Sequence, residues 1–143
     1  MSEYLINGPI ESGLIAAAIA EAGSMKSSGA HSLFIGQVRD DIIDGRSVES
    51  IEYSAYEPII KLEAEKIKGE IFSEFSDVTS VIILHSTGIV KTGGISLFVM
   101  VTASHRLQAI EACREIVERI KKRLPVWKKE IFGDDTHRWK DNS

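Results

Sequence analysis

Two near-continuous apolar segments constrain the fold of this chain more than any other feature of its sequence. They run from Val78 to His85 and from Ile95 to Ala103, and Gly88, Gly93 and Gly94 lie in the connection between them. Apolar runs of this length are typical of strands that are buried on both faces. We therefore expect a central strand pair that is covered on each side, by the chain's own helices or by another subunit.

The rest of the sequence predicts helices and further strands around this pair. Helical patterns occupy about Glu11 to Ala22, Glu57 to Phe75 and His105 to Arg123. Strand patterns occupy about Ser32 to Val38, Ser50 to Ala55, Val126 to Phe132 and His137 to Trp139, with a polar loop from Arg39 to Ser47. Paired strands joined by short connections predict an α+β fold with a mostly antiparallel sheet. We expect a single domain over residues 1–143.

Composition favours a globular protein over a disordered or fibrous one, because 43% of the 143 residues are hydrophobic and 27% are charged. The lone Cys113 cannot form an internal disulfide, which indicates the cytoplasm. Neither a secretory signal nor an apolar run long enough to span a membrane is expected.

Several common catalytic motifs are missing from the sequence. It contains no Gly-rich phosphate loop, no Gly-x-Ser-x-Gly elbow and no His-Glu-x-x-His pair, and its four histidines are widely spaced. Cys113 lies on the apolar stripe of the last predicted helix, where burial makes a thiol a poor nucleophile. We therefore expect neither a metal site nor a cofactor, and we expect Cys113 to pack in the core.

The basic residues are concentrated in the last quarter of the chain. The formal net charge of −4 argues against general nucleic-acid binding. Residues 1–104 hold seven Lys and Arg against fourteen Asp and Glu, whereas residues 105–143 hold ten against seven. The density peaks at Lys121-Lys122-Arg123 and Lys128-Lys129, on either side of Pro125 and Trp127. These cations either complement the helix dipole in solvent, or lose solvation beside Trp127 and act as acids or bases.

A second basic corner is predicted where the last helix begins. Ser104 is a candidate N-cap, and the free amides of the helix start together with His105 and Arg106 could bind an anion. An ordinary capped helix with two exposed side chains is the alternative. Arg39, which follows a predicted strand, is a third basic candidate.

Helix length separates the two basic corners. Arg106 and Lys121 are fifteen residues apart, which is roughly 22 Å along a helix axis. Either the two residues serve two separate sites, or a symmetric dimer brings Arg106 of one subunit to Lys121 of the other. We prefer the composite site between subunits.

These residues lie in motifs that resemble the family of large, catalytic subunits of molybdopterin synthase. The resemblance rests on five segments and covers about Gly29 to Trp139. They are Phe34 to Arg39, Tyr53 to Tyr56, His85 to Gly88, Ser104 to Arg106, and the segment Lys-x-x-x-Pro-x-Trp-Lys-x-Glu from Lys121 to Glu130. The order and spacing of the last two segments are the most specific part.

The resemblance implies a fold, a reaction and partners. The fold is an α/β-hammerhead with an additional, mostly antiparallel β subdomain. The reaction converts cyclic pyranopterin monophosphate to molybdopterin by inserting two dithiolene sulfurs. The sulfur arrives as a thiocarboxylate on the Gly-Gly C-terminus of a small ubiquitin-like subunit, and two large subunits form a homodimer within a heterotetramer.

The resemblance also implies roles for individual residues. Lys121 and Lys128 match the family's catalytic lysines, either of which could be the general acid. Arg39, His105 and Arg106 match residues that bind the anionic part of the substrate, the last two from the neighbouring chain.

Three positions depart from the family pattern. Family members commonly have Glu at the position of Ser54, Arg at that of Ser86 and an acid at that of Gly94, and many continue further beyond Trp139. Two other functions compete with the enzyme. One is a homodimeric module that binds an anionic metabolite without chemistry, and the other is an interaction subunit that recognises a partner tail through Trp127.

Overall fold

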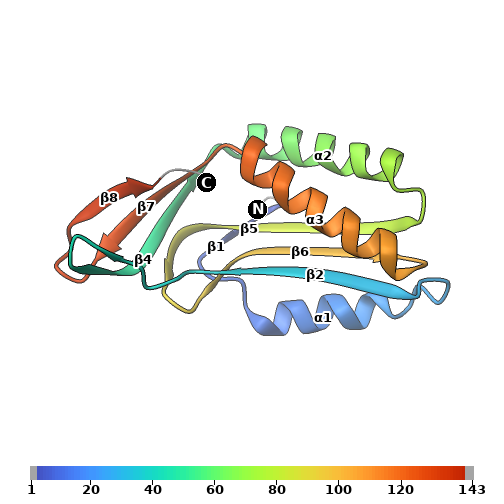
Figure 1. Cartoon of the computed structure of the whole chain (residues 1–143), viewed down its shortest axis with the longest axis horizontal. Coiled ribbons are helices and arrows are strands. Elements are labelled where there is room, and N and C mark those ends of the chain that lie inside the picture. Colours follow the sequence, from blue (N-terminus) through green and yellow to red (C-terminus); the bar gives the residue numbers. More distant parts are fainter. Residues whose placement is uncertain (1–2, 141–143) are drawn as a thin grey trace.

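The computed structural model describes residues 3–140, in which helices cover both faces of a sheet (Figure 1). The elements, in chain order, are β1 (Leu5–Asn7), α1 (Ser12–Ala22), β2 (Ala30–Gln37), β3 (Ile42–Ile43), β4 (Arg46–Ala55), α2 (Glu57–Glu74), β5 (Val78–Lys91), β6 (Ile95–Ala103), α3 (Arg106–Arg123), β7 (Val126–Phe132) and β8 (His137–Lys140).

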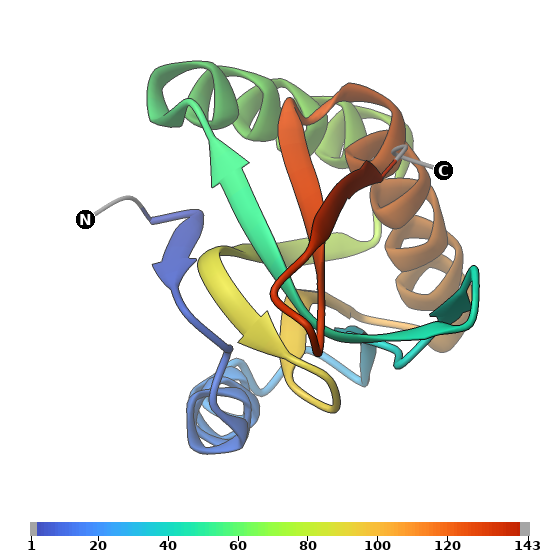
Figure 2. The ribbon, with the colours of Figure 1, turned by 90° about the vertical axis from the view of Figure 1, so that its left-hand side faces the viewer.

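The strands form one mainly antiparallel sheet in the order β2-β6-β5-β4-β7-β8. The short strand β1 pairs in parallel with β5, and β3 pairs with β4. Strands β4, β7 and β8 extend beyond the helices at one end of the molecule, the end that faces the viewer in Figure 2. The α+β class with a mostly antiparallel sheet is therefore confirmed.

Strand β5 is longer than the sequence predicts, because it changes partner along its length. Its first half pairs with β6, whereas Gly88 to Lys91 pairs with β4. Gly88, which was expected in a loop, has a φ of +75° and lies within the strand, where the pairing with β4 begins. A glycine there gives the backbone the freedom to turn from one part of the sheet into the other. The true turn contains Gly93 and Gly94 instead.

The chain's own helices cover the central strands on both faces. Phe98 and Met100 of β6 pack in a cluster with Ile15 of α1, below the sheet in Figure 1. The intervening Val99 and Val101 belong to the larger cluster under α2 and α3, on the opposite face. This settles the alternative that the sequence left open, since no second subunit is needed to bury these strands.

The polar loop predicted from Arg39 to Ser47 contains a tight hairpin. Ile42 and Ile43 pair with Ser47 and Arg46, and the two residues between them, Asp44 and Gly45, have φ values of 52° and 76°. Positive φ at both central residues is the geometry of a type I′ turn, for which Asp-Gly is a preferred sequence. This signal was present in the sequence, but only two apolar residues precede it.

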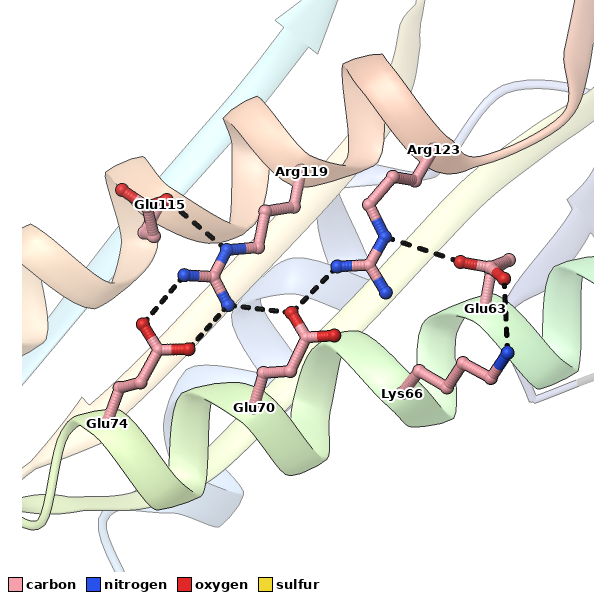
Figure 3. A network of polar contacts seen from close by, with 7 residues as sticks. All are labelled: Glu63, Lys66, Glu70, Glu74, Glu115, Arg119 and Arg123. Carbon is pink, nitrogen blue, oxygen red and sulfur yellow. Dashed lines mark hydrogen bonds and ion pairs between the residues drawn. The ribbon is translucent and has the colours of Figure 1, made fainter.

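A network of ion pairs joins α2 to α3 (Figure 3). Arg119 lies 2.7 Å from Glu74 and 2.8 Å from Glu70, and Arg123 lies 2.7 Å from Glu70 and 3.3 Å from Glu63. The arginines lower the pKa of the Glu70 and Glu74 carboxyls by hydrogen bonding and charge. The carboxylates of α2 therefore balance the charge of Arg123, and this residue joins the two helices, unlike the neighbouring Lys121.

Two glycines allow a matched test of this fold. We expect Gly88→Ala to lower the free energy of unfolding by about 1–3 kcal/mol, because a side chain is strained at positive φ. The new Cβ would also clash with Oδ1 of Asn7. Gly69→Ala, on the exposed side of α2 with nothing within 4 Å of the new Cβ, should raise it by about 0.5–1 kcal/mol. Urea unfolding measures both, and changes of the same sign would contradict the role of Gly88.

Candidate functional site

A cavity of about 320 Å³ lies where β2, β4, β7 and β8 meet the end of α3. Its lining includes seven polar or charged residues, namely Gln37, Arg39, Tyr53, Ser96, Lys121, Lys128 and Lys140. Three residues predicted from the sequence, Arg39, Lys121 and Lys128, are therefore brought together. Lys140 was not predicted.

Strand register explains which lysines face the cavity. Tyr53 of β4, Lys128 of β7 and Lys140 of β8 are direct cross-strand partners and share one face of the sheet. The next residue, Lys129, lies on the other face and pairs with Glu52 at 3.2 Å. Lys121 is added from the last turn of α3, whereas Lys122 is exposed. Strand register therefore selects Lys128 over Lys129, and the orientation of the last turn of α3 selects Lys121 over Lys122.

The environment of Lys128 makes its ammonium easier to deprotonate. The residue is 8% exposed, and burial lowers its pKa from the ordinary 10.5 to about 8, with further lowering by the nearby Lys121 and Lys140. An amine with a pKa close to neutrality can both donate and accept a proton under physiological conditions. Lys128 is thus poised for acid-base chemistry by geometry and charge.

A buried histidine lies beside the two lysines. His85 is 4% exposed and, with Lys121 and Lys128, lines a small hollow. Burial and the charges of these lysines lower the imidazole pKa to about 4. Its Nδ1 donates to the backbone carbonyl of Ser86 at 2.8 Å, and its ring meets Tyr53 edge-on at a centroid distance of 5.3 Å. His85 is therefore neutral at physiological pH and does not compensate for the charge of the lysines.

Trp127 does not form the apolar wall beside the lysines that its place next to them in the sequence predicts. Its side chain is 53% exposed and alternates with Lys128 along β7. The apolar residues that line the small hollow with Lys128 are Ile120, Leu124 and Val126. Period-two alternation, applied to β7 and to β8, would have put Lys128 and Lys140 on one face and Trp127 on the other.

His105 and Arg106 lie at the opposite end of α3 from the cavity. The helix begins at Arg106 with His105 as its N-cap, so the expected Ser104 cap is wrong. The carboxylate of Asp77 accepts a hydrogen bond from the backbone amide of His105 at 2.8 Å. The same carboxylate lies 3.2 Å from Nδ1 of the His105 ring. The helix start is thus already bound to an anion, while Arg106 is exposed and has no ion pair within residues 3–140. One chain alone does not bring this pair to the lysines.

Two of the positions that depart from the family pattern lie in tight surroundings. Ser86 is fully buried, and its hydroxyl donates to the carbonyl of Ile95 at 3.4 Å. A Cβ on Gly94 would lie 2.7 Å from a side-chain carbon of Val90. An acid at position 94, which the family resemblance implies, would therefore require Val90 or the backbone of Lys91 to move.

Comparison with known proteins gives this arrangement a family. The model of the MoaE protein family matches residues 8–123, which is most of the chain. The chain belongs to this family. A MoaE relative, the molybdopterin synthase catalytic subunit of Pyrococcus abyssi, is 40% identical over 111 residues, which cover 78% of this chain and 74% of that protein. The chain spans 36% of the length of the catalytic subunit that it matches in Drosophila willistoni.

Solved structures support the same conclusion for the fold. Molybdopterin synthase from Staphylococcus aureus superposes with a TM-score of 0.82 and 28% identity over 98% of each chain. A second structure is the protein-protein complex of subunits 1 and 2 of molybdopterin-converting factor from Helicobacter pylori. One chain of it superposes with a TM-score of 0.81 and 24% identity, over 95% of this chain and 88% of that one. At this identity the likeness shows the fold alone. These likenesses confirm the MoaE fold that the resemblance implied, an α/β-hammerhead with an added β subdomain.

Within residues 3–140, no helix is long and apolar enough to cross a membrane. In the same range, no three side chains of His, Cys, Asp or Glu are grouped so that they could hold a metal ion.

The lowered pKa of Lys128 predicts that this residue reduces the free energy of unfolding while its amine becomes more reactive. A pKa of about 8 in the folded state, against 10.5 in the unfolded state, means that the charged form costs about 3 kcal/mol at neutral pH. We expect Lys128→Met to raise the free energy of unfolding by up to that amount below pH 8. Between pH 8 and 10.5 the difference in the free energy of unfolding between the variant and the wild type should shrink. In this range the folded wild type releases the Lys128 proton, whereas its unfolded state still holds it.

Lys129→Met is the control for this prediction. It removes the same charge from the adjacent residue, but Lys129 is paired with Glu52 on the other face. Denaturant unfolding between pH 6 and pH 11 should therefore show no stabilisation. An equal gain in both variants would mean that net charge, and not the burial of Lys128, is the cause.

Proposed function

We propose that this chain is the catalytic subunit of a molybdopterin synthase, a sulfurtransferase that converts cyclic pyranopterin monophosphate to molybdopterin in the cytoplasm. The observation that most supports this is the meeting of Arg39, Lys121 and Lys128 in one cavity, with Lys128 buried. Membership of the MoaE family supplies the reaction. The cavity volume of about 320 Å³ falls in the range of sites for small organic ligands.

Each residue of the cavity has a role that its chemistry allows. The guanidinium of Arg39 binds the phosphate through charge-assisted hydrogen bonds. As the thiocarboxylate sulfur forms a bond to the substrate carbon, the C–O bond of the leaving oxygen breaks and Lys128 donates a proton to that oxygen, since its pKa of about 8 suits proton transfer near neutrality. Water then hydrolyses the resulting thioester, which leaves the sulfur on the pterin and releases the small subunit with a C-terminal carboxylate. The ammonium of Lys121 stabilises the charge that develops on the tetrahedral intermediate.

The sulfur comes from a partner in this proposal. Cys113 is 4% exposed within the core, and burial raises the pKa of its thiol, so it is a poor nucleophile. A small ubiquitin-like subunit with a Gly-Gly thiocarboxylate supplies the atom. The two-subunit complex from Helicobacter pylori supports an assembly of this kind.

A homodimer within a heterotetramer completes the site. Arg106 is exposed at the end of α3 remote from Lys121, in the same 18-residue helix. A two-fold axis that places one α3 start beside the partner's cavity would add His105 and Arg106 to the anion-binding groups.

Alanine variants test the catalytic assignment. We expect Lys121→Ala and Lys128→Ala each to reduce molybdopterin formation by at least about 10²-fold, because each removes a charge or proton donor at the reacting atoms. The assay incubates the protein with cyclic pyranopterin monophosphate and the thiocarboxylated small subunit, and measures molybdopterin. Lys122→Ala, an exposed neighbour, is the matched control and should turn over normally.

Binding measurements separate the competing functions. Both lysine variants should retain the small subunit, as measured by size-exclusion chromatography. Normal turnover by both variants would contradict the catalytic roles. A wild type that binds the pterin monophosphate but makes no molybdopterin would instead indicate a binding module.

A mixing experiment tests the shared site. Arg106→Ala and Lys121→Ala chains, each inactive alone, should regain about a quarter of wild-type activity when co-assembled, because half the dimers are mixed and each has one intact site. Arg39→Ala mixed with Lys121→Ala should regain none, since both residues line the cavity of one chain. Activity in neither mixture would contradict the composite site.

A further inference from the structure

The cavity carries more positive charge than its neighbours balance. Arg39, Lys121, Lys128 and Lys140 all line it. Within residues 3–140, one carboxylate forms ion pairs with any of these four cations, that of Asp41. The buried Glu130 is already paired with Arg138 at 2.9 Å. The lining therefore has a surplus of cations that an incoming anion would balance.

Lys140 occupies a position that is costly without an anion. Its side chain is 24% exposed and lies directly across the strand pair from Lys128. Like charges at directly opposed positions destabilise an antiparallel pair. Lys140 also contributes to the lowered pKa of Lys128, so the two ammonium groups repel each other across the cavity. A bound anion between them would remove this repulsion.

Asp41 contacts two of these cations at once. Its carboxylate lies 3.4 Å from Nε of Arg39 and 3.9 Å from Nζ of Lys140. Charge-assisted hydrogen bonds are typically about 2.7–2.9 Å long, so both contacts are loose. The backbone of Asp41 is fixed by the hairpin, because its carbonyl accepts the amide of Val48 at 2.8 Å. The side chain can therefore leave the cations without unfolding the segment.

We propose that Arg39 and Lys140 form an anion seat at the mouth of the cavity, and that Asp41 is an internal counter-anion which the incoming anionic group displaces. The identity of that group as the phosphate of a pterin substrate rests on the proposed function. The seat itself rests only on the placement of these three side chains. Asp41 thereby weakens anion binding and keeps the empty cavity less repulsive.

Calorimetric titration with inorganic phosphate tests the seat without pterin or partner. Asp41→Asn should tighten phosphate binding about tenfold at low ionic strength, and Lys140→Gln should weaken it by a similar factor. Both effects should shrink as salt is added. Asp40→Asn removes the same charge from an exposed neighbour that pairs with none of the cavity cations, and should leave the affinity within about twofold of wild type.

Further variants keep the outcome decisive. Lys140→Arg preserves the charge and should bind phosphate like the wild type, which separates loss of charge from loss of folding. Asp41→Asn should still tighten phosphate binding in the Lys140→Gln background, but by less than in the wild type, because Asp41 then competes with the anion at Arg39 alone. Equal affinities for Asp41→Asn and Asp40→Asn, an unaltered Lys140→Gln, or no phosphate binding by wild type and Asp41→Asn alike would overturn the proposal. Failure to form molybdopterin, with the phosphate results as expected, would overturn the proposed function alone.

Discussion

Backbone hydrogen bonding along β5 holds the two parts of this molecule in a fixed relation, because the same strand pairs first with β6 and then with β4. The change of partner occurs around Gly88, whose cross-strand partner is Tyr53. From Tyr53 the same row of paired residues continues to Lys128 and Lys140. The row of paired residues that places Lys128 and Lys140 at the cavity thus starts where β5 changes partner, far from both lysines in the sequence.

The basic end of α3 is resolved into two electrostatic environments. On the side that faces α2, carboxylates neutralise Arg119 and Arg123 (Figure 3). On the side that faces the cavity, Lys121 meets Lys128 with a neutral His85 beside them. Burying the charged amine of Lys128 without a paired carboxylate lowers the stability of the fold. The burial of apolar side chains elsewhere in the core offsets this loss. The same chain segment therefore stabilises the fold with one face and provides reactive amines with the other.

The sequence predicted those features that leave a local pattern. The helices α2 and α3 and the β7–β8 hairpin follow from apolar stripes and turn residues, and the motif around Pro125 led to Lys121 and Lys128. The full length of β5 was missed because a strand that changes partners has no single pattern of faces. Lys140 was missed because its importance comes from register with Lys128 across a turn. The roles of His105 and Arg106 stay predictions, since a site shared between chains is not visible in one chain.

The pairing of β4 with β7 contains one irregularity, between Val48 and Ser50, at the end remote from Lys128. From Ser50 to Ala55 the two strands then pair without interruption. Because side chains alternate, the parity of a residue's position decides whether it faces the cavity or the outside. A one-residue deletion in β7 between Pro125 and Lys128 would exchange the parity, placing Lys129 at the cavity and Glu130 outside. Near Val48, the irregular pairing of β4 with β7 can accommodate a change in strand length. Near Lys128 the pairing is regular, so the insertion or loss of one residue there would change which side chains face the cavity.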